Sequence, residues 1–261
     1  MRKSKIKLSA WLTVAATVLV SGMTAAEAAG VTANIANGKT IFTSGKGDAQ
    51  ACQTCHGEKA LGNDAMGAPR LANIGYGYVV KQLTNFSQDK RTPGGVGAVM
   101  PGFAKALSEQ DRRDVSAYVN SLDSAPELSD LKELKAQGQV VGEVYKGAEI
   151  AQHGIKDKVS ACSSCHGFNG AGVDPMFPKI GQQKYVYLVN QLKNWRANPA
   201  DISGGAVART NDQNAIMRKI AQKLTDEDIV NVAAYLSAAS PSKGGGDAVP
   251  DNNMMLHKVT H

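Results

Sequence analysis

Hydrophobic and polar positions along this chain repeat with the period of an α-helix. The clearest segment follows Ser108, a good N-cap residue that has Asp111 three positions later. Its apolar residues form one stripe at helical spacing: Val115, Tyr118, Val119 and Leu122. Thr225 and Asp228 begin the same pattern before a second stripe: Ile229, Val232, Tyr235 and Leu236. No segment alternates convincingly with period two, so we expect an all-α fold.

The two halves of the chain align with each other, which predicts an internal duplication. Matches that begin at Tyr76 recur at an offset of 109 residues, and those that begin at Met100 recur at an offset of 117. The second half has therefore gained residues between Trp195 and Met217. Besides the last helix, each half should hold a first and a middle helix: residues 36–44 and 76–88, and residues 142–153 and 185–194.

The N-terminus reads as a secretory signal. Four basic residues stand in the first seven positions, residues 8–20 are mostly apolar, and Ala26-Glu27-Ala28 is a small-x-small cleavage site. An uncleaved membrane anchor is the alternative, but the apolar run is short for a span of about 20 residues. The predicted organisation is a signal peptide, a domain, a linker, a second domain and a flexible tail: residues 1–28, 29–122, 123–142, 143–240 and 241–261.

Charge does not indicate a nucleic-acid partner. The formal net charge of +6 falls to +3 without residues 1–28, which hold four basic residues and Glu27. The remaining basic residues are scattered and are not interleaved with aromatic residues. Export would ordinarily favour two disulfides for the four cysteines. Each cysteine, however, belongs to a Cys-x-x-Cys pair that is followed at once by histidine.

Cys-x-x-Cys-His predicts one covalently bound haem c in each half. Cysteines at i and i+3 present both thiols on one side of a helical turn, which suits addition to the two vinyl groups of one porphyrin. The next residue can then give an imidazole nitrogen to the iron. The expected attachment residues are Cys52, Cys55, Cys162 and Cys165, and the expected ligands are His56 and His166.

Three other uses of these cysteines are weaker. A Cys₄ zinc or iron–sulfur site would have to join two pairs that lie 110 residues apart, at equivalent points of a repeat. A thioredoxin-like redox pair needs a βαβ context, which the pattern lacks. Plain disulfides leave His56 and His166 unexplained.

Methionine is the expected ligand on the opposite face of each iron. Met100 and Met217 fall at the same position of the repeat, each on a loop before the last helix. Core packing is the ordinary role of methionine and is the alternative. Met66, Met176, His153 and the tail residues Met254, Met255, His257 and His261 are weaker candidates. Pro69 and Pro178 are either plain turn residues or place a carbonyl to orient the histidine. Arg91 and Trp195 are candidate contacts of the haem propionates.

The residues Cys52-Gln53-Thr54-Cys55-His56-Gly57, the Met100-Pro101 segment and the near copy of both resemble the dihaem cytochromes c of the cytochrome c4 type. The resemblance covers residues 33–239. It implies two cytochrome c folds related by a pseudo-twofold axis, with haem propionates facing each other. It also implies His/Met ligation by His56 with Met100 and by His166 with Met217. The linker looks longer and more charged than the family pattern, and the Gly-rich tail is additional.

The expected function is that of a periplasmic electron carrier rather than an enzyme. Donors such as a quinol-oxidising complex and acceptors such as a terminal oxidase or reductase are the expected partners, and peripheral association with a membrane surface stays open. A dihaem peroxidase or a thiosulfate-oxidising cytochrome would need a vacant or displaceable iron position, whereas this sequence offers Met to both irons. A fixed subunit of a dehydrogenase complex is not separated from a free carrier by the sequence.

Overall fold

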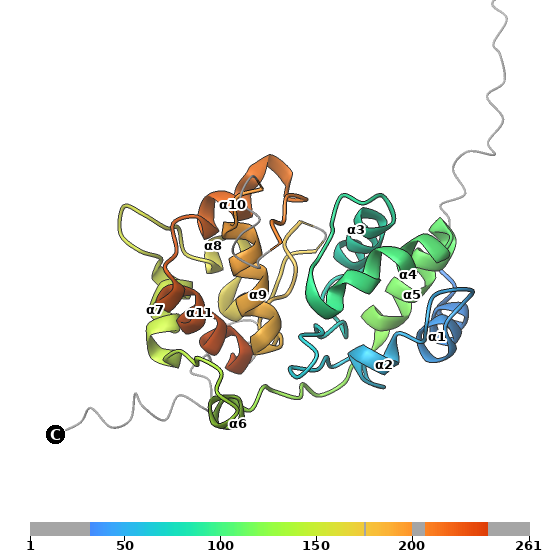
Figure 1. Ribbon diagram of the computed structural model, residues 1–261, viewed down its shortest axis with the longest axis horizontal. Coiled ribbons are helices and arrows are strands. Elements are labelled where there is room, and N and C mark those ends of the chain that lie inside the picture. The colour runs from blue at the N-terminus through green and yellow to red at the C-terminus, as the bar shows by residue number, and fades with distance from the viewer. Residues whose placement is uncertain (1–31, 175, 200–206, 240–261) are drawn as a thin grey trace, which may run out of the picture. The chain divides into compact units, whose positions relative to one another are not determined.

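The computed structural model describes residues 32–174, 176–199 and 207–239 (Figure 1). Over these residues the regular elements are helices, and β-pairing is limited to isolated bridges such as Lys46–Ala49. The predicted all-α fold is confirmed. The predicted signal peptide (residues 1–28) and tail (residues 241–261) lie outside the described residues. From Ala33 onward the described residues belong to one compact unit.

Five helices and a 3-10 turn make up the first half. They are α1 (Ile35–Ser44), α2 (Gln53–His56), α3 (Tyr76–Ser87), η1 (Gly95–Val99), α4 (Met100–Ala106) and α5 (Glu109–Ser121). The second half repeats the order of the helices and has one more 3-10 turn, η2: α7 (Val144–His153), α8 (Ser163–His166), η2 (Phe168–Gly170), α9 (Tyr185–Arg196), η3 (Gln213–Ala215), α10 (Ile216–Ala221) and α11 (Asp226–Ala238). The three long helices expected in each half are therefore present within about two residues of their predicted bounds.

The capping residues predicted for the last helices are confirmed. Ser108 Oγ accepts from Asp111 N, and Asp111 Oδ2 accepts from Ser108 N in return. Thr225 and Asp228 form the same reciprocal pair at the start of α11. Such a capping box satisfies two backbone N–H groups that have no partner inside the helix.

The structure adds two features to the predicted pattern. The segment between the halves, predicted as a plain linker, contains α6 (Leu131–Ala136), whose N-cap Asp130 accepts from Lys132 N and Glu133 N. In addition, Met100 and Met217 lie in short helices, α4 and α10, and not on loops as predicted. Pro101 in the first turn of α4 is compatible with a helix because its missing N–H would have no partner there.

In each half the first helix crosses the last one at a glycine. α1 packs on α5 and α7 packs on α11 (Figure 1). A Cβ atom at Gly38 would lie 2.0 Å from Asp114 O, and one at Gly147 would lie 1.9 Å from Asn231 O. Because only glycine permits this approach, both helix pairs touch backbone to backbone.

Each half has its own hydrophobic core. Ile41, Phe42 and Val119 are nearly fully buried in the first half, where the rings of Phe42 and Tyr118 are 5.5 Å apart. Tyr185 and Tyr235, each 1% exposed, are the largest fully buried side chains of the core in the second half. None of the helices in the described part of the chain has the length and apolar character needed to cross a bilayer.

Polar residues join the two halves. Gln183 accepts from Arg70 N at 2.6 Å and donates to Arg70 O at 3.0 Å. Lys179 N donates to Ile74 O at 3.2 Å. Backbone groups far apart in the sequence are therefore paired across the junction, as expected for halves that pack together.

Candidate haem centres

Each Cys-x-x-Cys-His motif forms a single helical turn. His56 N donates to Cys52 O at 3.0 Å, and His166 N donates to Cys162 O at 2.9 Å. No disulfide joins any of the four cysteines. Each turn therefore presents two sulfur atoms next to a histidine, as the motif requires for attachment of a porphyrin.

Both motif histidines are oriented by a proline carbonyl. His56 and His166 are each 7% exposed. His56 Nδ1 lies 2.9 Å from Pro69 O, and His166 Nδ1 lies 2.9 Å from Pro178 O. Because a carbonyl oxygen only accepts, Nδ1 carries the proton and Nε2 keeps its lone pair. The structure thus favours the orienting role of the proline carbonyls, and Nε2 is the nitrogen available to a metal.

Burial keeps the two imidazoles neutral. It lowers the pKa of His56 and of His166, although the bond to the proline carbonyl raises each pKa in part. A metal ligand must offer a neutral imidazole, so this environment suits iron ligation.

The thiols do not have the character of a reactive redox pair. Burial raises the pKa of Cys52 to about 11 and that of Cys162 to about 11. Catalytic Cys-x-x-Cys pairs instead lower the pKa of the attacking thiol. The thioredoxin-like alternative therefore lacks support from the site as well as from the fold.

A Cys₄ metal site is also without support. Within residues 32–174, 176–199 and 207–239, no three His, Cys, Asp or Glu side chains gather as a metal ion would need. Each cysteine pair belongs to its own half, on α2 or on α8.

The two candidate methionines occupy equivalent helices. Met100 is the first residue of α4, which packs on α3, and Met217 is the second residue of α10, which packs on α9. Both side chains are half-buried. Among the competitors, Met176 is 72% exposed and His153 is exposed at the end of α7. The candidates in the tail lie outside the described residues.

Sequence reasoning missed part of the polar junction between the two halves. Arg91 was a candidate, but Arg209 was not, and the two guanidinium groups share the acceptors Gln82 and Gln191. Arg209 stacks 4.1 Å from the ring centre of Trp195, and Arg91 stacks 4.6 Å from that of Phe86. The equivalence of Phe86 and Trp195 in the repeat was the available signal.

Comparison with known proteins decides the family. A cytochrome c family model matches residues 35–123 and again residues 144–240. The chain belongs to the cytochrome c family. The "Cytochrome c4" of Pseudomonas aeruginosa is 33% identical over 195 residues, which span 74% of this chain and 85% of the relative. This cytochrome is therefore a dihaem electron carrier of the c4 type, with two covalently bound haem c groups.

A second relative and a solved structure are also similar to this cytochrome. A "Thiosulfate dehydrogenase electron acceptor" of Stutzerimonas stutzeri (strain A1501) is 33% identical over 216 residues, 82% of this cytochrome and 91% of the relative. The crystal structure of reduced cytochrome c4 from Pseudomonas stutzeri matches with a TM-score of 0.59 and 30% identity, over 79% of this cytochrome and 98% of that chain.

A longer protein shares the same fold. The thiosulfate dehydrogenase TsdBA from Marichromatium purpuratum matches with a TM-score of 0.66 and 27% identity, over 79% of this cytochrome. The match covers only 40% of that chain.

Proposed function

We propose that Cys52 and Cys55 attach the first haem, and that His56 and Met100 would bind its iron. Cys162, Cys165, His166 and Met217 have the same roles for the second haem. The observation that carries the histidine assignment is the bond from each histidine Nδ1 to a proline carbonyl at 2.9 Å, which leaves Nε2 as the nitrogen with a free lone pair. The residues present fit a haem: each half has two thiols on one helical turn, a buried neutral imidazole and a methionine at the equivalent position of a short helix.

The ligands are held for electron transfer rather than for substrate binding. When bound, the haem supplies a one-electron iron couple. An iron held by both His and Met would have no position left for a substrate, and thioether sulfur favours the ferrous state. The proline carbonyls keep the imidazoles in one orientation, so that little rearrangement accompanies each change of charge. We therefore infer a carrier and not an enzyme.

The location and the partners follow from the same inference. Export by residues 1–28 places the mature cytochrome in the periplasm, with domains at residues 29–122 and 143–240 joined by residues 123–142. A quinol-oxidising complex is the proposed donor class, and a terminal oxidase or reductase is the proposed acceptor class. Both exchange single electrons with proteins in that compartment.

A second donor is suggested by two relatives. Proteins from Stutzerimonas stutzeri and from Thiomonas intermedia, 33% and 30% identical, are both named "Thiosulfate dehydrogenase electron acceptor". A thiosulfate dehydrogenase would then reduce this cytochrome. Mixing the oxidised cytochrome with such an enzyme and thiosulfate in a stopped-flow spectrometer tests this donor. No faster reduction than with thiosulfate alone would exclude it.

Methionine ligation is tested by replacing Met100 and Met217 with alanine, singly and together. Sulfur–iron(III) bonding gives a weak absorption band in the red. We expect two haems per chain in every variant, the loss of one haem's share of that band in each single variant, and complete loss in the double variant. Absorption spectroscopy of the oxidised protein with haem quantitation measures both.

Met66→Ala and Met176→Ala are the matched controls, because both methionines lie near the motifs but are not proposed ligands. Both controls should keep the full band. A band that survives in the double variant, or that disappears in a control, would contradict the assignment.

A further inference from the structure

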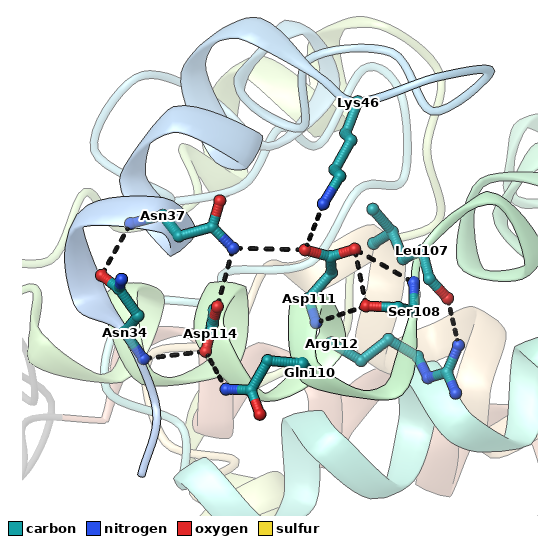
Figure 2. Close-up of polar contacts among 9 residues, drawn as sticks. All are labelled: Asn34, Asn37, Lys46, Leu107, Ser108, Gln110, Asp111, Arg112 and Asp114. Carbon is teal, nitrogen blue, oxygen red and sulfur yellow. Dashed lines mark hydrogen bonds and ion pairs between the residues drawn. The ribbon is translucent and has the colours of Figure 1, made fainter. Parts of the chain in front are cut away.

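The two short helices that contain the proposed methionine ligands are supported alike at their C-terminal ends. Arg112 on α5 donates through Nη1 to Leu107 O, directly after α4 (Figure 2). Arg196, the last residue of α9, donates to Leu224 O at 3.0 Å, shortly after α10. Leu107 and Leu224 are equivalent in the repeat, although their two arginines are not. The C-terminal ends of α4 and α10 are therefore held in the same way.

The N-terminal end of α10 is closed by a buried carboxylate. Asp212 Oδ2 accepts from Arg218 N at 3.0 Å, and Asp212 Oδ1 accepts from Arg218 Nε at 2.7 Å. The side chain of Asp212 is 5% exposed and that of Arg218 is 28% exposed. Because Arg218 directly follows Met217, the carboxylate binds both the backbone and the side chain of the residue next to the proposed ligand. Charge-assisted bonds to a buried acid stabilise a segment more than an exposed ion pair does.

The segment between Asp212 and Met217 has a strained backbone. Asn214 and Ala215 both have positive φ, 54° and 56°, and Ala215 is the N-cap residue of α10. The left-handed conformation is unfavourable for alanine, because its Cβ lies too close to the following carbonyl oxygen. Such a conformation persists only where surrounding contacts determine it. The two bonds of Asp212 join the ends of this segment and provide such contacts.

The equivalent segment of the first half is built from different residues. Three of the six residues before Met100 are glycines, and Val96 and Val99 in the same stretch are exposed. Gly95 has a φ of 58°, which glycine adopts without strain. Val99 is the N-cap residue of α4, and no side chain in the described part of the chain caps this helix. The approach to Met100 therefore lacks the closure that Asp212 gives to the second half.

We propose that Asp212 and Arg218 are positioning residues for Met217, and that the second haem therefore keeps its methionine longer than the first when another ligand competes. The inference rests on the proposed ligation by Met100 and Met217. A thioether has to leave the iron before another ligand takes its place, so exchange follows the local opening of the segment that contains the methionine. A small anion should thus displace the methionine of the first half before that of the second.

Cyanide exchange in the oxidised holoprotein tests the proposal. Cyanide binds ferric iron through carbon while the sulfur–iron bond breaks, and no electron is transferred. Met217→Ala leaves Met100 as the source of the red band, and Met100→Ala leaves Met217. With cyanide in excess, we expect the band of Met217 to decay at least about tenfold more slowly than the band of Met100. Equal rates, or faster decay of the Met217 band, would overturn the proposal.

Asp212→Asn tests whether the difference comes from the buried pair. An amide offers one acceptor atom in place of two, so in the Met100→Ala background the Met217 band should decay at least about tenfold faster with this substitution. Hydrogen exchange of the Arg218 backbone N–H should become faster as well. Arg218→Lys, which keeps the charge but loses the Nε donor, should give a smaller acceleration and serves if Asp212→Asn does not fold. An unchanged decay in both variants would overturn the proposal.

Asp89→Asn is the matched control in the first half. It removes the partner of Lys105 on α4, in an ion pair whose side chains are 50% and 56% exposed. In the Met217→Ala background it should change the decay of the Met100 band by less than about twofold. An acceleration as large as that of Asp212→Asn would contradict the particular role of the buried pair.

The same variants separate a failure of positioning from a failure of ligation. Before cyanide is added, haem content and the red band of the two methionine variants report on attachment and on sulfur–iron bonding. A methionine variant that keeps the full band would refute the proposed ligand itself. Bands that are lost as expected, but decay at equal rates in cyanide, would refute only the positioning role of Asp212 and Arg218.

Discussion

Two buried aspartates in the first half differ in chemistry from their counterparts in the second. Asp114 accepts from Asn34 N, Asn37 Nδ2 and Gln110 Nε2 at 2.8, 2.7 and 2.6 Å (Figure 2). Asp111 accepts from Lys46 Nζ at 2.7 Å and from Ser108 (Figure 2). These acids hold the start of α1 against α5 through charge-assisted hydrogen bonds.

We expect the protonation of Asp111 to make the stability of the folded state depend on pH. Burial by itself would raise the pKa of Asp111, but hydrogen bonds from Lys46, Ser108 and Asn37 outweigh it and hold the pKa at about 2, below the ordinary 3.8. A depressed pKa stabilises the folded state above the unfolded pKa, and this stabilisation disappears as pH falls from about 4 to about 2.

We expect Asp111→Asn to lower the free energy of unfolding at pH 7 by about 2 kcal/mol, and to flatten its dependence on pH over that acidic interval. Urea titrations at neutral and acidic pH measure both effects. Asp228→Asn is the matched control, since Asp228 bonds Thr225 at the same position of the capping box but forms no ion pair with a lysine among the described residues. Equal pH profiles for the two variants would count against the role of Lys46.

At the level of the elements, the crossing of the first and last helices determines the packing of each half. In the second half an amide replaces the carboxylate: Asn231 Oδ1 accepts from Glu143 N at 2.7 Å at the start of α7. Both crossings use a glycine, but the side chain that bonds the start of the first helix differs: it is a carboxylate in the first half and an amide in the second. Backbone contact at the glycine is therefore the common requirement, and the neighbouring hydrogen bonds vary.

Gly38→Ala should destabilise the cytochrome by about 3 kcal/mol, because the new Cβ would meet Asp114 O at 2.0 Å and the helices would have to separate. Thermal unfolding followed by circular dichroism measures the loss. Lys39→Ala changes an exposed neighbour on α1 and should leave stability within about 0.5 kcal/mol. A stable Gly38→Ala protein would show that the crossing can widen without cost.

For the molecule as a whole, each half caps a helix of the other. Asp64 Oδ1 accepts from Val186 N at 3.0 Å, at the start of α9. Asp174, its counterpart, accepts from Gly77 N at 3.3 Å and Tyr78 N at 3.4 Å, at the start of α3. Neither helix has a side-chain cap from its own N-cap residue. The loop after each haem motif thus stabilises the middle helix of the opposite half.

Asp64→Ala should cost about 1 kcal/mol, the usual cost of losing a cap, and it should weaken the docking of the halves. Differential scanning calorimetry of the holoprotein would then show the unfolding transitions of the halves moving apart. Asp48→Ala alters an exposed turn within the first half and should shift neither transition. Coincident transitions in Asp64→Ala would mean that the reciprocal caps contribute nothing to docking.

The sequence by itself determined the duplication, the number of haems, the long helices and the two capping boxes. The helices, the capping boxes and the haem motifs depend on residues within a few positions of one another, and the duplication shows as a repeat of these local patterns, so periodicity and motif spacing report them directly. The boundaries of the predicted domains and the methionine ligands stay predictions. Helix α6 was missed because its segment has mixed charge and a proline at its beginning, which the pattern of a loop shares.

Only the tertiary structure shows which residues of one half form hydrogen bonds with the other half. The pairing of Arg91 with Gln191, of Arg209 with Gln82 and of Asp64 with Val186 joins residues 100 to 127 positions apart. No local spacing marks such partners, since an arginine or aspartate in a loop is ordinarily a solvated surface charge. At the junction these charged side chains are buried, so they bond to the other half instead of to water. Burial depends on how the whole chain packs and cannot be found from any one segment.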